Sequence, residues 1–304
     1  MAAGPDWLDE LPLDPGPPHL RLGLRRVPES AWLLPDEQRA RHLALKADLL
    51  GRHRPEIVAV AEGRDSTQAQ TQTLALVTEW LRRYEPMLSP GTAASGDRSP
   101  DAGSGAGERG GVHADAPDLE AAARLVQEDL CLMAIGDGPP VLTAAVLCFP
   151  SHWRLADKIG LPMAAIHEPV SGYAEDLGHR PDHVLEHLAD DRIVARRNWL
   201  VHDGGDLFAP IVPAEVPLSV DEVPARLWLR SERQTLRRLP AGDHVLFTIR
   251  VQQLRFDGLG SRPDVAARLA AAVRAEAPDR SDRFAGGQVA PMLAWLDGLD
   301  RLGT

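Results

Sequence analysis

The chain has 304 residues, a formal net charge of −11, 44% hydrophobic residues and 25% charged residues. These ordinary globular values exclude a disordered chain. The acidic balance argues against binding to nucleic-acid backbones, which depends on clustered Lys and Arg. No stretch approaches the ~20 apolar residues of a membrane span, and the opening MAAGPDWLDELPLDPG lacks the pattern of a secretory signal. We therefore expect a cytoplasmic protein that binds neither membranes nor nucleic acid.

The chain has two cysteines, Cys131 and Cys148, and neither stands in a C-x-x-C pattern. This excludes thiolate zinc sites, iron–sulfur clusters held by this chain alone and covalently attached haem. Each cysteine lies in an apolar, strand-like run, which predicts core packing. Walker and G-x-S-x-G patterns are absent, and Gly258-Leu259-Gly260 lacks the third glycine and the strand-to-helix context of a dinucleotide site, so nucleotide binding is not supported and no serine nucleophile is marked.

The first third of the chain predicts two amphipathic helices, at residues 36–52 and 68–81, because apolar side chains recur at helical spacing. Residues 89–116 consist almost entirely of Gly, Ser, Ala, Pro and Asp, which is typical of a flexible linker or insertion. We therefore divide the chain into an N-terminal arm with helices (1–88) that packs on the core, the linker (89–116), and a core region (117–304).

The core region predicts strands that alternate with helices. The pattern indicates two hairpins, 129–134 with 141–149 and 227–239 with 245–254. Residues 153–206 between them predict a helical and irregular crossover, and two helices follow at 263–275 and 289–302. The expected fold class is α+β, an antiparallel sheet with helices gathered on one side.

Four histidines lie in or beside apolar segments: His152, His167, His202 and His244. A lone histidine in such a place is more often a hydrogen-bonded structural residue than a ligand. His167 is the strongest exception, because it follows the small apolar run GLPMAAI and precedes Glu168-Pro169. An imidazole at the edge of an apolar pocket suits an axial ligand of a flat apolar cofactor.

Another three histidines, His179, His183 and His187, have the i, i+4, i+8 spacing of one helix face. This resembles half of a zinc site. Pro181 interrupts the run, however, and no glutamate follows His183 as the zincin motif requires. The sequence therefore favours a solvated helix face.

The run Arg230-Ser231-Glu232-Arg233-Gln234 is polar within a predicted strand with apolar flanks. Alternation sends Arg230, Glu232 and Gln234 to one face and Arg233 to the other. Two interpretations stay open: an ion pair at a sheet edge, or a ligand site in which arginine binds a carboxylate and Glu232 relays protons. Arg196-Arg197-Asn198-Trp199 either packs in the core or borders the same pocket.

Several segments together resemble one family. AAVLCFPSHWRLADKIGLPMAAIHEPVSGY, RRNW, LRSERQTLRRLP and HVLFTIR are similar to segments of the haem-binding alpha subunit of the haem-dependent oxidative N-demethylases, which oxidise dimethylamine. The likeness covers most of residues 20–275. It implies a PAS-like fold, with a five-stranded antiparallel sheet and helices.

The resemblance also implies the site. It implies a noncovalent haem b with His167 as axial ligand of the iron, and Arg230, Glu232 and Arg233 as candidates for propionate anchoring and the distal polar set. Tyr173 either donates a hydrogen bond to bound oxygen or packs beside His167.

The implied activity is oxidation of a small secondary amine by dioxygen to a primary amine and formaldehyde. Electrons come from NADPH through a reductase partner that carries FMN and a 2Fe-2S cluster, and a partner subunit with tetrahydrofolate captures the formaldehyde. Because fold does not fix function, a non-enzymatic PAS-like sensor of haem or a small ligand is the alternative, and a scaffold subunit with an empty pocket is a third.

Overall fold

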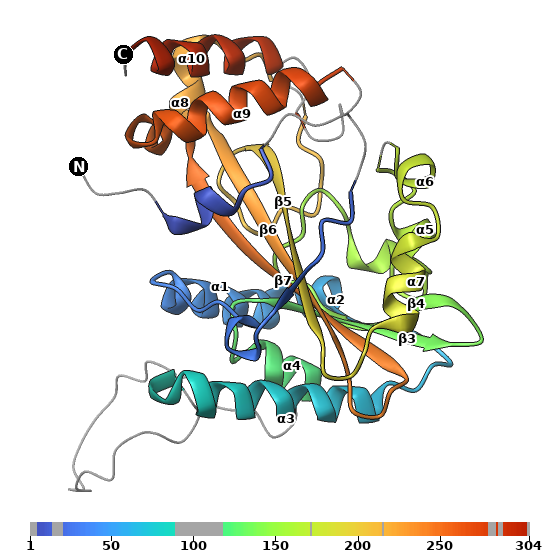
Figure 1. Cartoon of the computed structure of the whole chain (residues 1–304). Coiled ribbons are helices and arrows are strands. Elements are labelled where there is room, and N and C mark those ends of the chain that lie inside the picture. The colour runs from blue at the N-terminus through green and yellow to red at the C-terminus, as the bar shows by residue number, and fades with distance from the viewer. Residues whose placement is uncertain are drawn as a thin grey trace, which may run out of the picture.

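One antiparallel sheet of seven strands forms the centre of the protein, in the order β1-β5-β6-β7-β3-β4-β2 (Figure 1). The strands are β1 (Arg25–Val27), β2 (Val58–Val60), β3 (Asp129–Gly136), β4 (Gly138–Val146), β5 (Ile193–Asp203), β6 (Leu227–Arg238) and β7 (His244–Arg255). The structure is a computed structural model that describes residues 5–13, 21–88, 118–170, 172–214, 216–278, 284 and 288–302. The predicted linker at 89–116 lies outside them.

Both predicted hairpins are confirmed, as β3–β4 and β6–β7. The β6–β7 turn closes where the Gly242 N–H donates to the carbonyl of Leu239 (2.9 Å). Gly242 has a φ of +82°, a conformation that glycine adopts without a steric penalty. The β6–β7 register then places Arg233 opposite Arg250 and Leu236 opposite Phe247, so the alternation read from the sequence holds along both strands.

The expected number of five strands is wrong. Five strands, in the order β4-β3-β7-β6-β5, are flanked by the three-residue strands β1 and β2 at the two edges. β5 lies within 153–206, the segment predicted as a helical and irregular crossover. Its central Arg196-Arg197-Asn198 interrupts the apolar alternation that marks a strand.

The four helices expected at 36–52, 68–81, 263–275 and 289–302 are present, as α1 (Arg39–Arg52), α3 (Thr67–Tyr84), α9 (Pro263–Glu276) and α10 (Val289–Leu302). The shorter helices are α2 (Arg54–Ile57), α4 (Asp118–Ala123), α5 (Met163–Ile166), α6 (Tyr173–Asp176), α7 (Arg180–His187) and α8 (Val223–Arg226). Among the described residues, no helix is both long and apolar enough to cross a bilayer.

Helices cover both faces of the sheet, which corrects the expectation that they gather on one side. On one face, Arg233 and Arg250 donate hydrogen bonds to the N-terminal segment before α1, and α9 and α10 pack over Trp199 and Leu229. On the other face, the crossover carrying α5, α6 and α7 packs against the sheet (Figure 1). Because buried side chains alternate to both faces of the central strands, each face needs a cover.

Candidate functional site

An open pocket with a cavity volume of about 130 Å³ lies between the crossover and the sheet. Apolar side chains provide most of the lining, among them Leu24, Met163, Val170, Val184, Leu236 and Phe247. Its polar side chains are His167 and Tyr173 from the crossover and Arg196, Asn198 and Gln234 from β5 and β6.

His167 directly follows α5, a single turn that starts after the extended Pro162. Its Nδ1 lies 2.9 Å from the backbone carbonyl oxygen of Met163. A carbonyl oxygen only accepts hydrogen bonds, so Nδ1 carries the hydrogen and Nε2 of the neutral ring is left with a lone pair. Burial lowers the pKa of His167, which favours that neutral form. Metal-ligating histidines have this same outer hydrogen bond.

Tyr173 stacks on His167, with ring centroids 4.7 Å apart and 7° between the planes. It opens α6, directly after Gly172, which has a φ of +74°. The Tyr173 hydroxyl is buried and has no hydrogen-bond partner among the described residues. Burial raises the pKa of Tyr173 to about 12, so the phenol stays protonated at neutral pH. A protonated, unpaired hydroxyl beside a pocket is a donor available to a ligand.

The sheet wall of the pocket carries a strip of polar side chains, Arg196, Asn198 and Gln234, and Glu232 lies next to them on the same strand face without lining the pocket. Arg196 pairs with Gln234 in the β5–β6 register, and Asn198 pairs with Glu232. Gln234 Nε2 lies 3.5 Å from Glu232 Oε2, the long limit of a hydrogen bond. The sequence left open whether Arg196-Arg197-Asn198-Trp199 borders the pocket, and the structure places Arg196 and Asn198 in its lining together with Gln234, which was not among the predicted site residues. Their signal was the polar interruption of two otherwise apolar strands.

Arg230 lies behind this strip and does not line the pocket. It is fully buried and donates hydrogen bonds to the carbonyls of Phe149 (2.5 Å) and Leu207 (3.3 Å). Its Nε lies 3.6 Å from Glu232 Oε1. Arg230 thus ties β6 to the loops that follow β4 and β5, and its charge stands next to the Glu232 carboxylate.

Arg233 lies on the opposite face of the sheet, as strand alternation requires. Its guanidinium donates to the backbone carbonyls of Trp32 (3.0 Å) and Ala31 (2.5 Å). The expectation that Arg233 anchors a propionate conflicts with this placement, because the strand separates it from the pocket. Arg233 is therefore not among the residues that line the pocket.

Two other predicted histidines form a separate pair near Arg230. The rings of His152 and His202 stack, with centroids 4.4 Å apart, and Ser151 Oγ lies 2.8 Å from His202 Nε2. Burial, and secondarily the Arg230 charge, lower the pKa of His202 to about 2. This neutral pair does not line the pocket. His244 is buried at the start of β7, also away from the pocket lining.

The residues present fit a haem. Apolar walls suit the porphyrin, the bare Nε2 of His167 suits the iron, and the buried Tyr173 hydroxyl is left without a partner for a bound molecule. Arg196, which lines the pocket, provides a guanidinium suited to a carboxylate.

Fold and site together define an α+β protein with a mostly apolar pocket between a sheet and its crossover. The chain matches the family described as haem-dependent oxidative N-demethylase, alpha subunit-like, over residues 23–283. The chain therefore belongs to this family. The match begins just before β1 and spans every strand and all of the pocket lining except Leu22.

Proposed function

We propose that this chain binds haem b and oxidatively N-demethylates a small secondary amine of the dimethylamine type. In this reaction the amine, one dioxygen, two electrons and two protons give a primary amine, formaldehyde and one water. The supporting observation is His167, whose Nδ1 is held by the Met163 carbonyl while Nε2 is left for a metal in an apolar pocket. Family membership supports the same cofactor.

Haem, when bound, supplies the activation of dioxygen. In this proposal the residues of this chain orient the bound molecules and transfer protons to them. Tyr173 supports the His167 ring by stacking, and its buried hydroxyl donates into the pocket. Glu232 accepts and releases protons next to Gln234 and Asn198, and Arg230 holds the Glu232 carboxylate in place from behind. Arg196 pairs with a haem propionate.

The chain carries no flavin or iron–sulfur motif in its sequence, so in this proposal electrons come from NADPH through a cytoplasmic reductase with FMN and a 2Fe-2S cluster. A partner subunit with tetrahydrofolate then accepts formaldehyde. The family is described as alpha subunit-like, which supports a protein that acts in a complex with other subunits.

Absorption spectroscopy of the chain reconstituted with hemin tests the haem site. We expect a Soret band that His167→Ala shifts or abolishes and that the exposed control His179→Ala leaves unchanged. A chain that stays colourless, or a His167→Ala spectrum identical to that of wild type, would contradict the proposed haem site. With NADPH, a supplied reductase and dimethylamine, we expect formaldehyde release; a Soret band without formaldehyde under these conditions contradicts the enzymatic proposal and favours a sensor.

A further inference from the structure

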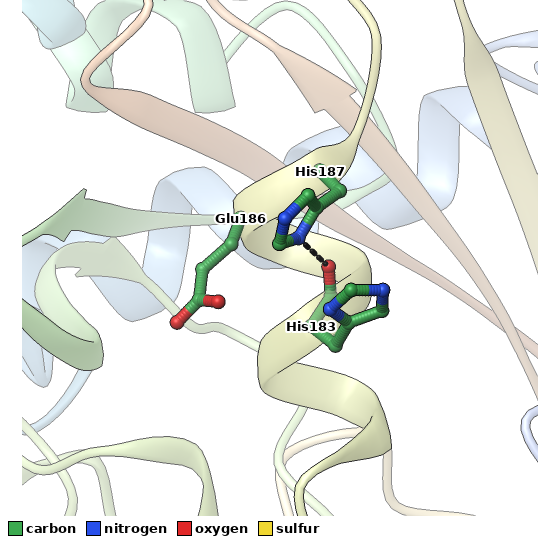
Figure 2. A group of neighbouring side chains, drawn as sticks. All are labelled: His183, Glu186 and His187. Atoms are coloured by element: carbon green, nitrogen blue, oxygen red, sulfur yellow. Dashed lines mark hydrogen bonds between the residues drawn. The ribbon is translucent and has the colours of Figure 1, made fainter.

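The outer face of α7 carries two imidazoles one helical turn apart. The rings of His183 and His187 have centroids 4.0 Å apart and are exposed to solvent (Figure 2). Glu186 extends from the same turn (Figure 2). One ligand atom from each of the three side chains lies within 4.8 Å of the other two. The opposite face of α7, with Pro181, Val184 and Leu185, lines the pocket, so this group points away from it.

The orientation of the His187 ring is set by a hydrogen bond to its own helix. Its Nδ1 lies 2.9 Å from the backbone carbonyl oxygen of His183, drawn as the dashed line in Figure 2. Nδ1 is therefore the donor, and Nε2 of the neutral ring presents a lone pair to solvent. A ligating imidazole whose other nitrogen donates to a backbone carbonyl is the usual arrangement at protein metal sites.

The backbone that carries these side chains is anchored to the sheet. Arg238, near the end of β6, donates to the carbonyls of Leu185 (3.1 Å), Glu186 (2.5 Å) and Leu188 (2.7 Å). These carbonyls lie at the end of α7, where helical partners run out. A fixed last turn lowers the ordering cost of gathering three ligands around one ion.

His179 does not join the group, although its spacing in the sequence suggests that it should. It stands before the first turn of α7, its side chain is fully exposed, and its ring faces Asp182 at 4.0 Å. Glu186 takes its place, so the donor set is two imidazoles and one carboxylate. Zinc accepts this set at bond lengths of ~2.0–2.2 Å with water as fourth ligand, so binding requires the three side chains to rotate from their positions in this structure.

We propose that His183, Glu186 and His187 form a surface site for a divalent transition-metal ion, with Zn²⁺ as the physiological occupant. The ion bridges positions one turn apart and stabilises the last turn of α7, which forms a wall of the pocket. This site is independent of the proposed haem chemistry, because its ligands lie on the other face of the helix.

Isothermal titration of ZnCl₂ into the full chain, prepared without a polyhistidine tag, tests the site. We expect one zinc per chain, with affinity reduced at least about tenfold in His183→Ala and in His187→Ala. The matched control His179→Ala keeps wild-type affinity. Cu²⁺ should bind more tightly than Zn²⁺, and Mg²⁺ should not compete, since imidazole suits borderline metals. Zinc should also raise the melting temperature of wild type but not of the double variant.

Two results would overturn the proposal. The first is wild-type zinc affinity equal to that of the His183→Ala, His187→Ala double variant. The second is an equal loss in His179→Ala, which indicates nonspecific binding along a solvated histidine stripe. Far-UV circular dichroism of each variant without metal separates loss of ligands from loss of the helix.

Discussion

The imidazole of His167 and the phenol ring of Tyr173 lie parallel, with 4.7 Å between their centroids. This relationship places Tyr173 beside the proposed iron ligand, on the crossover wall of the pocket, and not on the sheet wall. Of the two roles that the sequence left open for Tyr173, packing beside His167 is the one this geometry favours, while the unpaired hydroxyl leaves a donor role available.

Removing the Tyr173 ring should loosen haem more than removing its hydroxyl. Tyr173→Phe keeps the stack on His167, whereas Tyr173→Ala leaves the imidazole free to rotate. We expect haem loss about tenfold faster for the alanine variant, since a ring contact contributes ~0.5–1.5 kcal/mol beyond its buried area. Haem transfer to an apo-globin measures the rate. Equal loss from both variants would assign the effect to the hydroxyl.

Removing the charge of Glu232 should separate haem binding from turnover. Glu232→Gln keeps the size of the side chain beside Gln234 and Asn198 but no longer transfers a proton. We expect an unchanged Soret band and formaldehyde release lowered by about 10²-fold or more, the usual contribution of a positioned acid–base group. The control is Glu37→Gln, an exposed carboxylate on the N-terminal segment. Full activity in Glu232→Gln would remove Glu232 from the mechanism.

Arg233 should affect stability rather than haem. Arg233→Met removes two charged hydrogen bonds from a buried position, leaving the carbonyls of Ala31 and Trp32 unpaired. We expect the free energy of unfolding to fall by about 2–4 kcal/mol. Urea unfolding of the haem-free chain measures this change, and the exposed Arg83→Met serves as control. If Arg233→Met had normal stability but weaker haem binding, Arg233 would instead belong to the haem site.

Acid should destabilise the fold through His42. Its Nδ1 accepts hydrogen bonds from Gln127 (3.0 Å) and Arg250 (3.3 Å), so the ring is neutral in the fold. Burial, and secondarily the Arg250 charge, lower the pKa of His42 to about 4. The unfolded chain, with a pKa of ~6.5, binds more protons below that pH, so His42 contributes stability that is lost as pH falls from ~6.5 toward 4.

The variant His42→Gln isolates this contribution. Between pH 6.5 and 4, the free energy of unfolding of wild type should fall more steeply than that of His42→Gln, by up to about 1.4 kcal/mol per pH unit. Urea midpoints across this range measure both slopes. Parallel curves would show that His42 titrates alike in the folded and unfolded chain.

Local pattern was sufficient for most elements of the fold. Period-two alternation along 227–239 predicted β6 and assigned Glu232 and Gln234 to one face and Arg233 to the other, as the structure has them. Helical spacing likewise predicted α1 and α3. These predictions succeed because burial of one side of an element imposes its period on the residues themselves.

The resemblance placed His167 at the proposed iron site, but only tertiary structure shows what surrounds it. The sequence did not predict β5 because its arginines and asparagine interrupt the apolar period. Arg196 and Asn198 face the pocket, and Arg197 bonds to Glu10 and Gln252. Arg196 and Gln234 are 38 residues apart in the sequence, and only the pairing of β5 with β6 brings them together. Amino-acid order therefore determined the period of most elements, whereas long-range pairing decided which side chains share a pocket, because a local period records that a face is covered and not what covers it.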